Sequence, residues 1–172
     1  MKGFVFDIEY FMNNSFGGIS KYTTAEEDVL LFKTDSAFCE QVIPLSKEKM
    51  ICTQTLYDNE TLIITERVNY LKYGGVLIGE REYYNEDGTL NHTEDMDEHF
   101  PIKWEQMEQI LKDRDISLLT ADSIFRYYDE EKDLATWSII IKLAWDSGCL
   151  YVFDARTGEL LSKEIMDMRK EM

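Results

Sequence analysis

The sequence predicts an α+β protein: a mainly antiparallel sheet of about eight or nine strands, strongly twisted or split in two, with one main helix at about residues 101–114. Three observations support this prediction. Segments rich in β-branched and aromatic residues recur along the chain, and turn residues separate them. Only one segment has clear helical periodicity. At 172 residues, 44% of them hydrophobic, the chain is long enough to bury a sizeable core.

The first 50 residues have the least regular pattern. Residues 3–12 alternate loosely between apolar and polar side chains, which predicts a strand. Residues 25–33 combine acidic residues typical of a helix start with a Val-Leu-Leu-Phe run, and we favour a strand. Residues 44–49 begin with a proline, which favours a short helical turn.

Residues 50–93 have a clear β pattern. We expect strands at about 52–57, 61–70 and 76–84, with turns at Asp58-Asn59-Glu60 and Tyr73-Gly74-Gly75. The next turn contains Asp87-Gly88, a strong hairpin signal. This region therefore reads as a meander of about four strands.

The segment from His92 to His99 is strongly acidic and has no hydrophobic periodicity, so it reads as a solvated linker. It marks the best internal boundary: the chain is one domain, 1–172, or two subdomains at 1–93 and 101–172. Pro101 then opens the helix, which should lie on a sheet because its apolar residues follow three- and four-residue spacing: Ile102, Trp104, Met107, Ile110 and Leu111.

After the helix we expect a strand at 123–128 and then three antiparallel strands between Leu134 and Ile165. Their turns lie at residues 146–148 and 155–158, and each contains a glycine suited to positive φ, Gly148 and Gly158. We expect Trp104 and Trp137 to fill the core.

The charge of the chain limits its partners. It has 34 acidic and 18 basic residues, for a net charge of −16. Such a chain repels phosphate backbones, which disfavours nucleic acid, whereas it attracts a basic protein surface. Plain solubility explains the same charge. The N-terminus lacks a signal-peptide pattern and no window is long enough to span a membrane, so we expect a soluble, cytoplasmic protein without a membrane partner.

No catalytic or metal-binding pattern stands out. Cys39, Cys52 and Cys149 are far apart in sequence, which favours free, buried thiols. His92 and His99, with the acids between them, match no zinc spacing, and an EF-hand reading fails because Phe100 stands where glycine is required. We therefore expect no cofactor, no metal and no enzyme activity.

Aromatic and acidic residues suggest a protein-binding surface. The tyrosines come as two adjacent pairs, so one member of each pair must face away from the other in a strand. Outward tyrosines surrounded by carboxylates suit a protein interface. The candidate partner-binding residues are Tyr83, Tyr84, Glu94, Asp95, Asp97, Glu98, Tyr127, Tyr128, Asp129, Glu130 and Glu131.

The last hairpin carries a family resemblance. A helix, a strand with Trp137 and then Val152-Phe153-Asp154-Ala155-Arg156-Thr157-Gly158-Glu159 resemble the PepSY-type module over about residues 101–165. This implies a helix on a small antiparallel sheet and a peptide-binding or protease-regulating role. Residues 79–90 (GEREYYNEDGTL) are similar to one unit of MORN-like repeats. In general character the chain also resembles immunity proteins of bacterial polymorphic toxin systems.

Two functional hypotheses follow. The first is an immunity or inhibitor protein that neutralises a basic partner, such as a toxin, by covering its basic site. Carboxylates of residues 94–98 and 129–133 would then take the place of phosphates. The second is a PepSY-like peptide-binding or protease-regulating module.

Overall fold

The computed structural model describes residues 5–170 and contains eleven strands in two sheets with two α-helices. The predicted α+β class with antiparallel sheets is confirmed, although there are more strands than the eight or nine expected. The chain forms two compact units. Unit 1 holds residues 1–72 and 77–96, and unit 2 holds residues 73–76 and 97–172.

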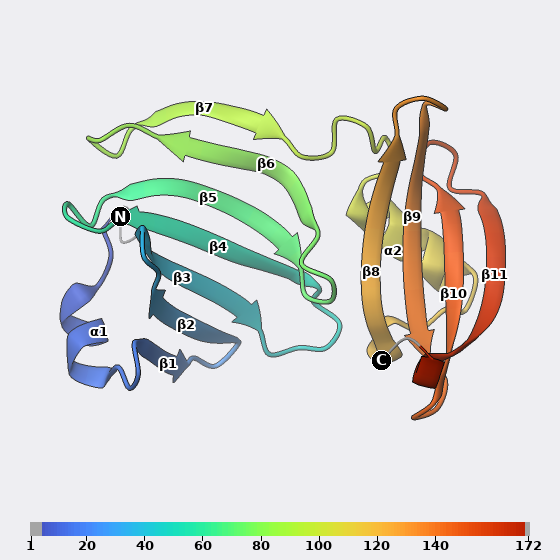
Figure 1. The fold of residues 1–172 in the computed structure, drawn as a ribbon, viewed down its shortest axis with the longest axis horizontal. Coiled ribbons are helices and arrows are strands. Elements are labelled where there is room, and N and C mark those ends of the chain that lie inside the picture. Colours follow the sequence, from blue (N-terminus) through green and yellow to red (C-terminus); the bar gives the residue numbers. More distant parts are fainter. Residues whose placement is uncertain (1–4, 171–172) are drawn as a thin grey trace. The chain divides into compact units, whose positions relative to one another are not determined.

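Unit 1 is an up-and-down meander in which each strand pairs antiparallel with the one before it, in the order β1 to β7 (Figure 1). Its elements are α1 (Ile8–Asn14), β1 (Ile19–Thr23), β2 (Glu27–Lys33), β3 (Ala37–Pro44), β4 (Ile51–Asp58), β5 (Ile64–Leu71), β6 (Leu77–Tyr84) and β7 (Leu90–Asp95).

Two predictions near the N-terminus were wrong. The expected strand at 3–12 contains helix α1 instead, and residues 3 and 4 lie outside the described part. Asp7 begins the helix because its Oδ1 accepts a hydrogen bond from the Tyr10 N–H at 2.9 Å. The expected helical turn at 44–49 is absent, since Pro44 ends β3 and pairs with Glu27 of β2. The strand favoured at 25–33 is confirmed as β2.

Strands β1 and β3 were not predicted. In β1 only Ser20 is buried, so this edge strand has no apolar alternation for a pattern search to find. In β3 the adjacent residues Phe38 and Cys39 are both buried, on opposite faces of the sheet. Strands with both faces partly covered lack a simple period of two.

One face of the seven-stranded sheet carries the hydrophobic core of unit 1, and we call it the α1 face. Phe6 and Phe11 pack there against Val29, Leu31 and Phe38, and the Phe6 and Phe38 rings stack at 4.7 Å between centroids. The N-terminal segment thus closes part of this face.

The acidic segment from His92 onward is not a linker at its start. Residues 90–95 form β7, which pairs with β6 through the registers Tyr83↔His92 and Arg81↔Glu94. All six residues of β7 are exposed. Because both faces of this edge strand meet solvent, it needs no apolar alternation, and a charged edge also discourages unwanted strand pairing.

Unit 2 contains a second antiparallel meander in the order β8 to β11, with α2 lying against one face (Figure 1). Its elements are α2 (Trp104–Asp113), a 3-10 helix (Leu118–Thr120), β8 (Ala121–Asp129), β9 (Leu134–Lys142), β10 (Ser147–Asp154), β11 (Leu160–Asp167) and a 3-10 helix (Met168–Lys170).

The predicted helix is confirmed, but it begins later than Pro101. Lys103 is its N-cap, and the Lys103 N–H donates to Gln106 Oε1 at 3.0 Å. Trp104 and Trp137 are buried as predicted, with ring centroids 5.7 Å apart. The Trp137 indole N–H donates to the Ile102 carbonyl at 2.9 Å, so the segment before the helix is also held on the sheet.

The two glycine turns of unit 2 differ from each other. Gly158 has a φ of 73°, as expected for the β10–β11 turn, where Asp154 Oδ1 accepts from the Thr157 N–H at 2.9 Å. Gly148 instead lies inside β10, and the turn occupies residues 143–146. A side chain at 148 would lie 3.1 Å from Met168 Sδ, so close packing, and not positive φ, explains this glycine.

Candidate partner-binding surface

The hairpin formed by β6 and β7 holds four of the predicted binding residues. Tyr83 stacks on His92 with ring centroids 4.5 Å apart, and its hydroxyl donates to Glu94 Oε2 at 3.0 Å. Burial and the hydrogen bond to Glu94 raise the pKa of the Tyr83 phenol. The half-buried Tyr83 and the exposed His92 and Glu94 therefore form one aromatic and acidic group on the face opposite the α1 face.

Tyr84 points the other way, which confirms that the two members of this pair lie on opposite faces. It packs against the core of the α1 face, and its hydroxyl donates to Glu82 Oε2 at 2.5 Å. Burial raises the pKa of Tyr84. Tyr84 thus fixes one end of β6 and also presents its ring at the hairpin turn.

The two arginines nearest this hairpin are already engaged. Arg81 makes a bidentate ion pair with Glu66, with both N···O distances 2.9 Å, and its guanidinium lies 5.1 Å from the Tyr83 ring centroid. The Nη1 of Arg67 is 3.9 Å from Glu82. Both arginines thus already form ion pairs with carboxylates of β5 and β6.

Several carboxylates of the hairpin have no such partner. Among the described residues, no lysine or arginine forms an ion pair with Glu80, Glu86 or Glu94. Glu80 also stands directly opposite Asp95 across the two strands.

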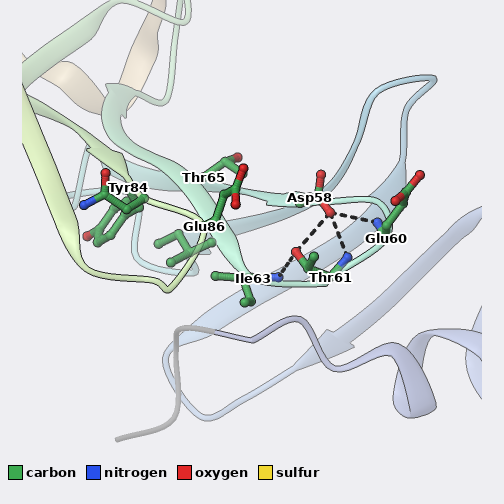
Figure 2. Close-up of a pocket in the computed structure, with 9 residues that line it drawn as sticks. Asp58, Glu60, Thr61, Ile63, Thr65, Tyr84 and Glu86 are labelled. Carbon is green, nitrogen blue, oxygen red and sulfur yellow. Dashed lines mark hydrogen bonds between the residues drawn. The ribbon is translucent and has the colours of Figure 1, made fainter.

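A pocket of about 320 Å³ lies next to the hairpin, between the β4–β5 turn and the β6–β7 turn (Figure 2). Its lining joins three carboxylates to hydroxyl, amide and apolar groups: Asp58, Glu60, Thr61, Ile63, Ile64, Thr65, Tyr84, Asn85 and Glu86. None of these described residues is basic. The pocket therefore has an acidic rim and a partly apolar lining.

Asp58 organises one wall of this pocket. Its Oδ1 accepts from the Glu60 N–H at 2.9 Å, the Thr61 N–H at 2.7 Å and the Thr61 hydroxyl at 3.0 Å. These hydrogen bonds lower the pKa of the Asp58 carboxyl, and the one from the Thr61 N–H has the largest effect. The turn predicted at Asp58-Asn59-Glu60 is confirmed, and its carboxylate is held in place by its own loop.

The second tyrosine pair lies in β8 of unit 2. Tyr128 stacks on His99 with ring centroids 4.0 Å apart, and its hydroxyl donates to Asp133 Oδ1 at 3.0 Å. Tyr127 is 63% exposed and lies on the sheet face that α2 does not cover. As predicted, only one member of the pair faces outward.

The acids predicted around this second pair have different surroundings. Asp129 forms an ion pair with Lys132 at 2.9 Å. Glu98, Glu130 and Glu131 are exposed, and no described basic residue pairs with them. Together with Tyr127 they offer a smaller acidic surface on unit 2.

Asp97 does not belong to that surface. It is only 6% exposed, and its Oδ1 lies 2.5 Å from Arg126 Nη1. Arg126 in turn lies 4.4 Å from the Phe100 ring centroid. The acidic sequence around Asp97 hid this structural role, because its arginine comes 29 residues later.

Sequence reasoning missed the pocket and the hairpin carboxylate Glu80. The β4–β5 and β6–β7 turns were recognised separately as turns, but nothing local indicated that they meet at one cavity. A register prediction for β4 to β6 would have been the signal, because those strands bring the two turns to the same end of the sheet.

The three cysteines are free and buried, as predicted, and burial raises the pKa of Cys39 to about 12, so its thiol is a poor nucleophile. Across residues 5–170 no group of His, Cys, Asp and Glu is arranged to hold a metal ion. Nor is any helix in that range long and apolar enough to cross a membrane.

Comparisons with known proteins give no assignment. No family model matches the chain, and no curated protein matches it.

Proposed function

We propose that this protein is an acidic protein-binding module that neutralises a partner by covering a basic site, as an immunity protein covers a toxin. One observation carries the proposal. The β6–β7 hairpin holds exposed carboxylates that form no ion pair with any described lysine or arginine, although Arg67 and Arg81 are close by. A partner that supplies positive charge would pair with these carboxylates.

The aromatic groups on the same hairpin strengthen the proposal. Tyr83 is held by His92 and Glu94, so little side-chain entropy is lost when a partner covers it. Tyrosine is also among the residues that contribute most at protein interfaces. The carboxylates would steer the partner into place, and Tyr83 would supply contact area.

The exposed group on unit 2 supplies a second, smaller surface of the same kind. It consists of Glu98, Tyr127, Glu130 and Glu131. It has three acids unpaired with any described lysine or arginine, as many as the hairpin, but Lys132 and Arg156 form ion pairs with Asp129 and Asp133 beside it. We assign it the weaker contribution to binding.

Affinity capture tests the proposed function. The tagged protein is incubated at low salt with lysate of its own source organism, in parallel with the variant E80Q/E94Q and the control E105Q/E159Q. The control removes two exposed acids elsewhere, from α2 and the β10–β11 turn. A captured protein is eluted with rising salt, identified by mass spectrometry and purified for an activity assay.

We expect one basic protein that elutes early from E80Q/E94Q and normally from the control, because surface charge attraction weakens with salt. Its activity should fall to zero at a stoichiometric amount of this protein. The proposal is wrong if the captured protein elutes at the same salt concentration from E80Q/E94Q as from wild type, or if the captured protein stays active in the complex.

A PepSY-like peptide-binding or protease-regulating role is the second candidate. The observation that favours it is the uncovered face of the unit 2 sheet, where Phe125 is 46% and Tyr127 is 63% exposed. An extended peptide would lie across these rings. Substitution of Phe125 and Tyr127 by serine should then abolish peptide binding, whereas E80Q/E94Q should leave it unchanged.

A further inference from the structure

We propose that the pocket between the β4–β5 and β6–β7 turns receives an arginine side chain from the basic partner. This inference deepens the proposed function and rests on it, because it names the group that the partner inserts. It makes the pocket the anchor of the interface and the β6–β7 hairpin its surrounding acidic rim.

The shape of the pocket suits a single side chain. Its volume, about 320 Å³, is at the lower end of the range for ligand pockets, which is too small for a folded element. The two turns that form it belong to the same sheet, and Figure 2 shows lining side chains that come from both turns. A long, unbranched side chain is the natural occupant of such a site.

The lining matches both parts of an arginine. Ile63 and the Tyr84 ring offer apolar and aromatic surface to the three methylene groups. The planar guanidinium stacks well on an aromatic face, which a lysine ammonium does less effectively. Ile64 is completely buried and Tyr84 packs on the core, so this part of the wall is fixed before a partner arrives.

The charges match the guanidinium. Asp58, Glu60 and Glu86 all line the pocket, and no described basic residue forms an ion pair with any of them. Asp58 is held by three hydrogen bonds within its turn. Glu60 and Glu86 are exposed and available at the rim. A guanidinium presents five N–H donors in one plane and can serve several carboxylates at once.

A peptide titration tests the pocket without the natural partner. The full-length protein, labelled with ¹⁵N, is titrated with the blocked tripeptide acetyl-Gly-Arg-Gly-amide. Matched peptides carry citrulline, which has the same shape without charge, or lysine. Amide signals of Thr61, Ile63 and Asn85 report on the pocket, and those of β8 to β11 serve as a remote reference.

We expect saturable shifts at the pocket with the arginine peptide, and at least about tenfold weaker binding for citrulline, which corresponds to about 1.4 kcal/mol. The variant E60Q/E86Q should bind the arginine peptide about tenfold more weakly. The control E105Q/E159Q should bind it as wild type does. The spectrum of E60Q/E86Q verifies that the variant is folded.

Three results would overturn the inference: no saturable shift at the pocket up to about 10 mM peptide, equal binding of arginine and citrulline, or unchanged binding by E60Q/E86Q. If the lysine peptide binds more tightly than the arginine peptide, the occupant is lysine and not arginine. The two proposals fail separately. If capture finds a basic partner that E60Q/E86Q binds normally, the pocket inference falls alone. If the peptide binds but no inhibited partner is found, the proposed function falls, and the pocket remains a site for arginine without that partner.

Discussion

Unit 1 and unit 2 are both antiparallel meanders, but they place their charged residues differently. In unit 2, the Arg126–Asp97 pair is enclosed, with side chains 10% and 4% exposed. In unit 1, the Arg81–Glu66 pair is half-buried, with side chains 30% and 15% exposed. Beyond that pair, the β6–β7 hairpin carries carboxylates that form no ion pair with any described lysine or arginine.

This difference separates two uses of charge in one acidic chain. A buried pair is structural, because either partner alone would be an uncompensated charge in a medium of low dielectric constant. Exposed acids contribute little to stability and remain available to a partner. We therefore expect the buried Arg126–Asp97 pair to affect folding and the exposed carboxylates to affect binding, most of all those of the β6–β7 hairpin.

The largest effect should come from Arg126→Met. This change leaves Asp97 buried without its cation, and we expect a loss of about 3 kcal/mol in the free energy of unfolding. The double variant R126M/D97N should recover most of that loss. Urea unfolding at pH 7 measures both. Arg81→Met is the matched change in unit 1 and should cost no more than about 1 kcal/mol. Equal costs for R126M and R81M would contradict the division.

The next effect concerns two adjacent glycines in residues 73–76 of unit 2. Gly74 and Gly75 have φ values of 99° and 65°. A Cβ at Gly74 would lie 2.0 Å from the Ile124 carbonyl oxygen, whereas Gly75 has open space. We expect Gly75→Ala to cost about 1 kcal/mol from positive φ alone and Gly74→Ala clearly more. Thermal unfolding of the two variants measures this difference, and similar losses would show that the loop shifts to relieve the contact.

A smaller effect is expected on association with the captured partner. E80Q/E94Q should lower the association rate constant about fivefold at low salt, because both charges lie in the proposed steering surface. E130Q/E131Q, on unit 2, should lower it about twofold. Stopped-flow measurements over a salt series test the order of the two effects, which should disappear at high salt. A larger effect of E130Q/E131Q would make unit 2 the main binding surface.

The smallest effect concerns Glu40, a half-buried residue of β3. Burial raises its pKa, and Arg67 opposes this shift. A raised pKa in the folded state means that the folded protein holds this proton more tightly, so the contribution of Glu40 to stability falls as pH rises through its folded pKa. Glu40→Gln should therefore stabilise the protein at pH 7. It should not stabilise the protein at pH values below the ordinary pKa of glutamate. Urea unfolding at both pH values tests this; a loss of stability at pH 7 would contradict it.

Local patterns in the sequence were sufficient for several elements. The helix containing Trp104, the turns at Asp58 and at Asp87-Gly88, and the opposite orientation of Tyr83 and Tyr84 were all predicted correctly. Each depends on residues within a few positions of one another, through helical periodicity, side-chain hydrogen bonds in turns or the alternation of a strand. Edge strand β1 was missed, and the end of β7 beyond the predicted β region was read as a linker, because solvent on both faces removes that alternation.

The sequence by itself determined the α+β class, the acidic character, the burial of Trp104 and Trp137 and the outward position of one tyrosine in each pair. Tertiary structure alone decided that Asp97 is buried against Arg126, that Tyr83 and Tyr128 stack on His92 and His99, and that two separate turns enclose one pocket. The reason is physical: propensity and turn chemistry act between near neighbours, whereas strand register brings together residues that are distant in sequence.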